Sequence, residues 1–223
     1  MKIDFLIEDA SGEKLIHAVM KKYAEEKPEY PIEYSTRSYK GMGGFVKGKD
    51  CHNVKAQQLL NDLPKRMRAI QAKNMGVEDA SLFVVLDNDI HDTELFRSQL
   101  DKLAKRENIM MDHVFCIAVE EMEAWLLGDR EAIQQAYGKI ADRIAGKYAG
   151  YRQDSIGGTW EFLADMLTKG GMTAFRKKNP TAMDVGICKS QWAENIGKYM
   201  SIRDNVSPSF QYFIRELDVR RDR

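Results

Sequence analysis

Acidic side chains stand where three apolar segments of the chain end, and this feature is the one best suited to chemistry. The apolar segments are residues 2–7, 81–86 and 114–119. If they are neighbouring parallel strands, their carboxyl ends meet at one edge of a sheet, where open α/β sheets bind their ligands. The acids that follow them are Glu8, Asp87, Asp89 and Glu120.

Carboxylates that converge in this way repel one another unless a cation neutralises them. Oxygen ligands without His or Cys favour Mg²⁺ or Mn²⁺ over zinc. Asp87 and Asp89 are two residues apart and can turn toward the same ion, and Glu123 would share a helix face with Glu120. Glu8, Asp87, Asp89 and Glu120 are therefore the candidate catalytic residues, and with Glu123 they are the candidate metal ligands.

Simpler interpretations of the same acids stay open. Aspartates cap helices and fill turns, and glutamates are favoured in the first helical turn, so one D-x-D motif is weak support for a metal site. Haloacid-dehalogenase-type phosphatases and sugar-nucleotide transferases also use D-x-D with a metal. In the phosphatases the motif follows the first strand, whereas Asp87 and Asp89 follow the third, and we find no nucleotide-binding motif that would support a transferase.

The segments that must position these acids alternate between strand and helix patterns. Strands are predicted at 2–7, 32–36, 81–86 and 114–119, with helices between them, which indicates a mostly parallel, doubly wound α/β sheet. Helices are predicted to begin at Thr93 as a cap, at Glu120 after the last strand, and at Ser207-Pro208. We expect an α/β core over residues 1–128 and a helical C-terminal layer packed on it over residues 129–223.

Composition restricts the class of protein. The 223 residues carry 34 Lys and Arg against 34 Asp and Glu, so any nucleic-acid contact must come from a local basic patch.

No apolar run approaches the length of a membrane span, which is about 20 residues. The cysteines are three in number and scattered, which favours a reducing compartment and a cytoplasmic location.

Two basic segments are candidates for binding a nucleic-acid strand. Residues 37–49 combine lysines, an arginine, glycines and aromatic rings, as backbone grooves require, although a surface loop would look the same. Residues 169–178 form the second segment. The candidate nucleic-acid-binding residues are Arg37, Lys40, Lys47, Lys49, Lys177, Lys178 and Lys189.

The chain also resembles a known group of proteins. A glutamate after the first strand and D-x-D after the third resemble the TOPRIM domain of topoisomerases, primases and overcoming-lysogenization-defect nucleases. Three blocks resemble more closely a TOPRIM-like family of small bacterial proteins. They are residues 7–13, residues 84–89 and residues 118–127, the last with the sequence Ala-Val-Glu-Glu-Met-Glu-Ala-Trp-Leu-Leu. The tail, with Lys189, Trp192 and residues 205–210, fits that family too, so the resemblance spans nearly the whole chain.

The resemblance implies a TOPRIM fold, Mg²⁺ dependence and cleavage of DNA or RNA. It assigns Glu8 as acid/base or metal ligand, Asp87 and Asp89 as metal ligands, and Glu120 or Glu123 as an added acid. Asp9 departs from the pattern, because the topoisomerases and nucleases usually have glycine after the first glutamate.

Relatives often accompany an ABC-type ATPase in anti-phage defence, which implies an ATPase partner and a toxic effector. The alternative is a latent or non-catalytic subunit docked on that ATPase through the helical C-terminal half, including the aromatic face of Phe210 and Phe213. A homo-oligomer is also left open.

Overall fold

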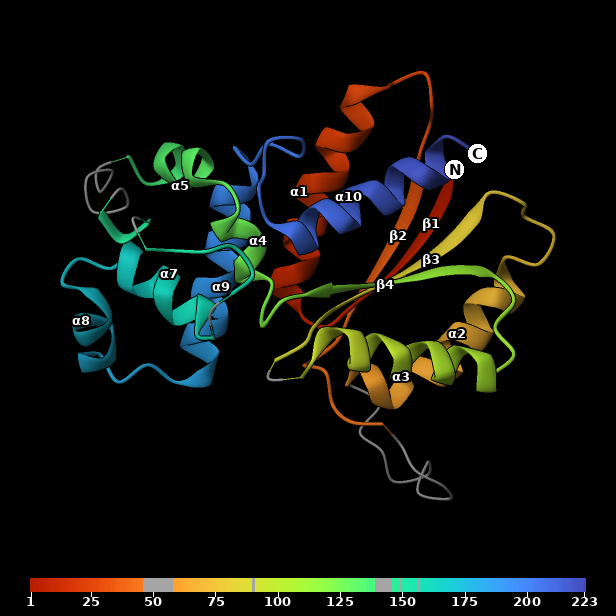
Figure 1. The fold of residues 1–223 in the computed structure, drawn as a ribbon, viewed down its shortest axis with the longest axis horizontal. Coiled ribbons are helices and arrows are strands. Elements are labelled where there is room, and N and C mark those ends of the chain that lie inside the picture. The colour runs from red at the N-terminus through yellow and green to blue at the C-terminus, as the bar shows by residue number, and fades with distance from the viewer. Residues whose placement is uncertain (46–57, 90, 139–145, 149, 156) are drawn as a thin grey trace.

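A four-stranded, all-parallel sheet forms the centre of the computed structural model, with the strand order β2-β1-β3-β4 (Figure 1). Its strands are β1 (Lys2–Ile7), β2 (Glu33–Ser38), β3 (Ala80–Asp87) and β4 (Asp112–Ala118). The structure describes residues 1–45, 58–89, 91–138, 146–148, 150–155 and 157–223. The predicted α/β class with a mostly parallel sheet is confirmed.

The register of the strands brings the predicted acids to one edge. Ile7 lies opposite Val85, and Asp87 lies opposite Ala118. Glu8 follows Ile7 directly, so its backbone reaches the carboxyl edge of the sheet beside the end of β3. All the strands run the same way, and the acids at their carboxyl ends therefore share one edge.

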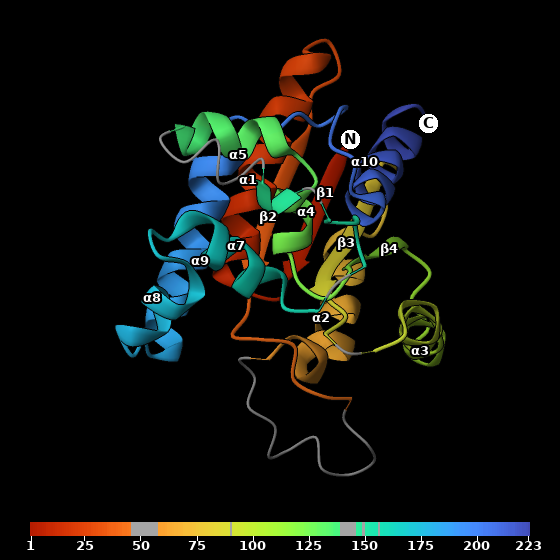
Figure 2. The ribbon, with the colours of Figure 1, turned by 60° about the vertical axis from the view of Figure 1, so that its left-hand side comes forward.

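Apolar side chains alternate between the two faces of the sheet, and each face has its own helices (Figures 1 and 2). Phe5 and Phe83 point to the face covered by α1 (Ala10–Glu26) and α10 (Pro208–Arg221). The opposite face, with Leu6 and Val84, is covered by α2 and α3. The bounds of those two helices are Leu59–Lys73 and Thr93–Arg106. Burial on both faces explains why β1, β3 and β4 contain nearly continuous apolar runs, whereas the edge strand β2 alternates and stays partly exposed.

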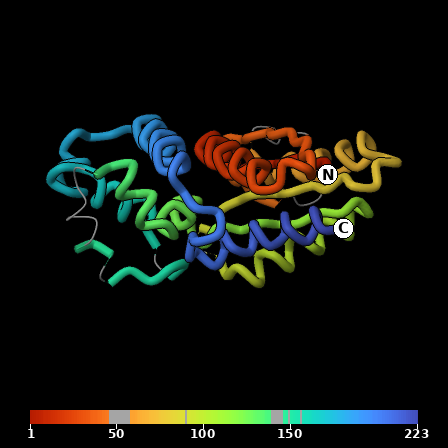
Figure 3. Tube along the Cα trace, turned by 90° about the horizontal axis from the view of Figure 1, so that it is seen from above, coloured from red at the N-terminus to blue at the C-terminus, as the bar shows by residue number. Residues whose placement is uncertain are grey.

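The C-terminal half is helical in the part of the chain that the structure describes. Its helices lie beside the sheet, and α10 then returns to pack on the sheet (Figures 1 and 3). A close approach joins the two halves, because a Cβ added at Gly197 would lie 3.0 Å from Cβ of Ala18 on α1. The helices are α4 (Glu123–Leu127), α5 (Arg130–Ala136), α7 (Thr159–Leu167), α8 (Gly171–Lys177) and α9 (Ala182–Gly197). The predicted domain boundary after residue 128 stays a prediction, since one hydrophobic cluster runs from the sheet through α9 and α10.

Two predicted helix starts are wrong. The helix expected from Glu120 begins at Glu123, because Glu120 adopts a positive φ of 65° that a right-handed helix excludes. The side chain that caps α3 is Asp92, which accepts from the N–H of Leu95 at 2.8 Å, and Thr93 is the first helical residue. The start at Ser207-Pro208 is confirmed.

The predicted docking face of α10 is also wrong. Phe210 and Phe213 are fully buried, with their rings within 6.3 Å of Phe5, Phe83 or Trp125. A partner cannot reach these rings because they form the core between α10, α4 and the sheet. No helix among the described residues is long and apolar enough to cross a membrane.

Candidate metal site at the carboxyl edge of the sheet

Glu8 and Asp87 meet at the carboxyl ends of β1 and β3. Oε2 of Glu8 accepts a hydrogen bond from the backbone N–H of Asp87 at 2.9 Å, and the N–H of Glu8 donates to the carbonyl of Val85 at 3.0 Å. The side chain of Asp87 is buried, and its Oδ1 atom has no hydrogen-bond partner among the described residues. A buried carboxylate oxygen without a partner is costly, so this atom is available to a ligand.

The two carboxyl groups disfavour each other's charge. Burial raises the pKa of Glu8 to about 7, the Asp87 N–H opposes that rise, and the charge of Asp89 adds to it. Burial also raises the pKa of Asp87 well above its usual value, and the charge of Glu8 raises it further. The charge of Lys189 lowers both pKa values, but burial and the neighbouring carboxylates outweigh it.

Lys189 on α9 reaches into the same place from the helical half. Its Nζ lies 3.0 Å from Oε2 of Glu123 and 3.3 Å from Oε1 of Glu121. Burial lowers the pKa of Lys189, but the carboxylates of Glu123, Glu121 and Asp87 outweigh it and hold the pKa above its usual value. Lys189 is thus a partly buried cation that is paired with two carboxylates, and not the free cation that the nucleic-acid prediction requires.

A single ammonium group faces more carboxylates than it can neutralise. Glu123 is almost completely buried, and burial raises its pKa to about 7 in spite of the charge of Lys189. The pKa of Glu121 is raised as well, first by burial. With Glu8 and Asp87, four carboxyl groups surround one lysine, and a further cation would lower the energy of the ionised cluster. We call these five residues the acidic edge.

Asn88 holds the strand ends together from the middle of the D-x-D motif. Its side chain accepts from the backbone N–H of Glu120 and donates to the hydroxyl of Thr93 at 2.7 Å. The N–H of Asp89 donates to the carbonyl of Glu120 at 3.0 Å, and Asp89 itself has a positive φ of 47° and is exposed. These contacts fix the ends of β3 and β4, and sequence reasoning missed the role of Asn88.

Glu120 does not point into the acidic edge. Its carboxylate accepts from the backbone N–H groups of Gly158 and Thr159, the latter at 2.6 Å, and so caps the first turn of α7. Because Glu120 lies before α4, it shares no helix face with Glu123, and that prediction is wrong. The acids that the structure brings together are Glu8, Asp87 and Glu123, with Asp89 at the exposed rim and Glu121 added.

The donors present suit a hard cation that keeps most of its own water. Among the described residues, no three His, Cys, Asp or Glu side chains are grouped so as to hold a metal ion by themselves. Mg²⁺, however, is usually bound by one or two carboxylates together with water and substrate phosphates. The unpartnered Oδ1 of Asp87 beside Glu8 meets this requirement.

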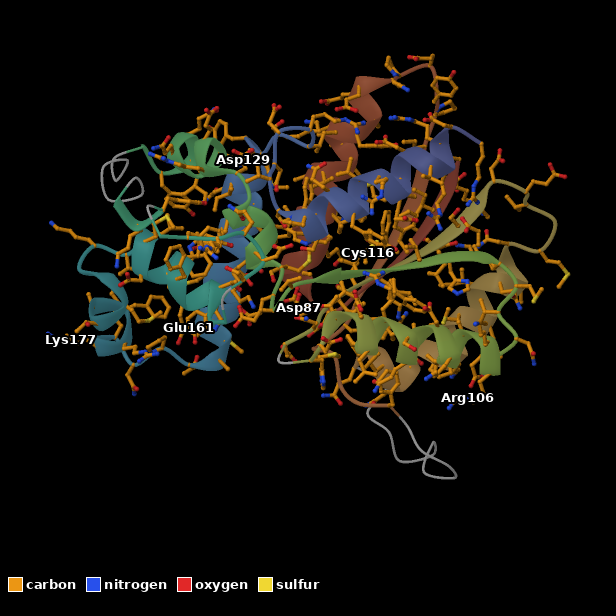
Figure 4. The ribbon with its side chains drawn as sticks, viewed as in Figure 1. Asp87, Arg106, Cys116, Asp129, Glu161 and Lys177 are labelled. Atoms are coloured by element: carbon orange, nitrogen blue, oxygen red, sulfur yellow. The ribbon has the colours of Figure 1, made fainter. Side chains whose placement is uncertain are left out.

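Of the basic residues predicted to bind nucleic acid, those that the structure describes fall in separate parts of it. Arg37 lies in the edge strand β2, and its guanidinium carbon is 5.4 Å from the ring centre of Tyr39. Lys40 follows this strand and is exposed. Lys47 and Lys49 lie outside the residues that the structure describes. Lys177 and Lys178 are exposed at the end of α8, far from Asp87 (Figure 4). Their roles stay predictions.

One known family matches nearly the whole of the described fold. A family model described as domain of unknown function (DUF4276) matches residues 7–218. The chain belongs to this family. The DUF4276 match covers the acidic edge and both halves of the molecule, but it carries no link to TOPRIM proteins or to the overcoming-lysogenization-defect nucleases. No curated protein and no solved structure matches the chain.

Proposed function

We propose that this DUF4276 protein binds Mg²⁺ or Mn²⁺ at Glu8 and Asp87 and hydrolyses phosphodiester bonds of a nucleic acid. The observation that carries the proposal is the buried Oδ1 atom of Asp87, which has no hydrogen-bond partner among the described residues and belongs to a carboxylate next to Glu8. Oxygen ligands of this kind select a hard divalent cation, and phosphate oxygens are the usual completion of its ligand set.

The position of each acidic residue suggests its role in metal binding. Glu8 and Asp87 would hold the metal, and the exposed Asp89 would approach it from the solvent side. Glu121 and Glu123 are already paired with Lys189, which leaves the two strand-end acids for the metal. When bound, the metal would lower the pKa of an attacking water and neutralise charge on the phosphate.

The step from metal to nuclease rests on the resemblance to TOPRIM proteins. The matching positions are Glu8, Asp87 and Asp89, since Glu120 caps α7. A role as toxic effector of anti-phage defence, an ABC-type ATPase partner, a homo-oligomer and a cytoplasmic location remain predictions. The latent subunit is the alternative, and no contact of the described residues favours it.

Cleavage assays test the proposal. Supercoiled plasmid, single-stranded DNA and tRNA are incubated with the purified full chain and Mg²⁺, Mn²⁺ or EDTA. We expect cleavage that requires the metal and falls by at least about a hundredfold in E8Q and D87N, as is typical for a lost metal interaction. The control is E161Q, which removes a half-buried carboxylate on α7. Equal activity in wild type and D87N would refute the proposal.

A further inference from the structure

A second polar site lies next to the acidic edge, on the outer side of the edge strand β4. Here α3 and α10 lie on either side of β4 (Figure 1). Between them is a pocket of about 570 Å³, which is in the range of small-ligand sites. Its lining includes Thr93 and Arg97 from α3, Asp154, and Tyr212 and Arg215 from α10.

Two arginines share one aromatic ring in this pocket. The guanidinium carbon of Arg97 lies 4.4 Å from the ring centre of Tyr212, and that of Arg215 lies 5.2 Å from it. Both distances are within the range of cation–π contacts. The arrangement therefore holds two positive charges close together, where they repel each other unless an anion lies between them.

Neither arginine has an acidic partner in the described part of the chain. Arg97 donates only to the backbone carbonyl of Phe115, and Arg215 is exposed with no ion pair within 4.0 Å. Among the described residues of the lining, Asp154 is the one acid, and its oxygens accept from the Ser207 hydroxyl at 3.0 Å and the Ser209 N–H at 2.7 Å. The pocket therefore retains a net positive charge, and guanidinium groups match phosphate geometry.

One hydrogen bond connects the pocket lining to the D-x-D motif at the acidic edge. The hydroxyl of Thr93 is hydrogen-bonded to Asn88, which separates Asp87 from Asp89. Val119, also in the lining, is two residues before Glu121 of the acidic edge. A nucleic-acid strand with one phosphate at Asp87 would reach Arg97 and Arg215 by extending past Thr93.

We propose that Arg97, Arg215 and Tyr212 form a binding site for a backbone phosphate of a nucleic-acid strand that extends from the acidic edge. This site rests on the proposed function for the nature of its ligand. It does not require cleavage, because phosphate recognition by guanidinium groups is independent of the metal.

Strand binding without metal tests this site separately from catalysis. The probe is a fluorescent single-stranded oligonucleotide in EDTA, and its anisotropy reports binding to the full chain. We expect R215E and R97Q each to weaken binding by about tenfold at low salt, because a charged hydrogen-bond donor is lost. The slope of the logarithm of the binding constant against the logarithm of the salt concentration should also fall by about one. The control, R106Q, removes the same charge at the other end of α3 (Figure 4), and we expect it to bind as wild type.

Each outcome decides the assignment. If Arg97 supports folding through Phe115, R215E still gives the answer, because Arg215 is exposed. Equal binding by wild type and R215E, or no binding by wild type in EDTA, would overturn the site. Displacement of the probe by a mononucleotide or inorganic phosphate at equal phosphate concentration would identify a free phosphate as the ligand. It would refute the assignment of a nucleic-acid strand. Strand binding that R215E weakens, combined with no metal-dependent cleavage, would retain this site and refute the proposed nuclease.

Discussion

Nζ of Lys189 lies 3.0 Å from Oε2 of Glu123, and this ion pair joins α9 of the helical half to the start of α4. The two side chains are 14% and 2% exposed, so water screens their interaction weakly. The pair explains how a cluster of carboxyl groups is tolerated at the edge of the sheet. It also makes the helical half part of the site.

Removing this partly buried cation should destabilise the protein. In K189M the carboxylates of Glu121 and Glu123 lose their ion pairs, and we expect the free energy of unfolding to fall by about 3 kcal/mol. Urea denaturation followed by circular dichroism measures it. The control is K14M, which breaks the exposed pair with Glu194 and should cost less than about 1 kcal/mol. Equal losses in the two variants would mean that Lys189 is not the internal counter-ion.

Glu120 should act on stability and leave metal binding unchanged. E120A removes the acceptor of the Gly158 and Thr159 N–H groups, and we expect a loss of about 1 kcal/mol, as for other helix caps. E120Q keeps an acceptor oxygen and should lose less. Thermal unfolding measures the stability, and calorimetric titration with Mg²⁺ measures binding. Loss of Mg²⁺ binding in E120Q would instead place this side chain among the metal ligands.

Asp4 should contribute stability that depends on pH. Burial alone would raise its pKa, but hydrogen bonds from Lys73, Ser35 and Asn74 outweigh it and lower the pKa. A lowered pKa in the folded state stabilises the protein above the pKa of the unfolded chain, and this contribution is lost as the pH falls through the folded pKa.

D4N therefore tests this contribution directly. At pH 7 we expect D4N to be about 2 kcal/mol less stable than wild type, because hydrogen bonds to a charged acceptor are lost. The difference should shrink below about pH 4, where Asp4 of the unfolded chain begins to protonate, and it should vanish as the pH falls through the lower pKa of the folded state. Denaturation at a series of pH values measures it, and a difference that stays constant down to pH 2 would contradict the lowered pKa.

Phe213 should behave as a core residue. Its ring lies 5.2 Å from that of Trp125 and 5.9 Å from that of Phe83, so F213A leaves a cavity and should cost about 4 kcal/mol. V219A, at an exposed position of the same helix, should change stability by less than about 0.5 kcal/mol. If Phe213 were instead an exposed docking residue, F213A would be as stable as V219A.

The sequence was sufficient for the sheet and for the convergence of the strand ends. The apolar run 2–7 matches β1. The proximity of Glu8 and Asp87 follows from the parallel direction of their strands. Glu120 could not be placed, because its positive φ accompanies a contact with the Asn88 side chain from another strand. Lys189 was not predicted as a counter-ion, because its partner Glu121 is 68 residues away in the chain.

Binding of Mn²⁺ to Asp87 is the most direct test of the account. Titration followed by electron paramagnetic resonance measures the loss of the free Mn²⁺ signal in the presence of wild type, E8Q, D87N and the E161Q control. We predict that wild type and E161Q bind Mn²⁺, that D87N loses this binding, and that E8Q weakens it by at least about tenfold. Identical binding curves for wild type and D87N, or no binding by wild type, would contradict the metal site at the acidic edge.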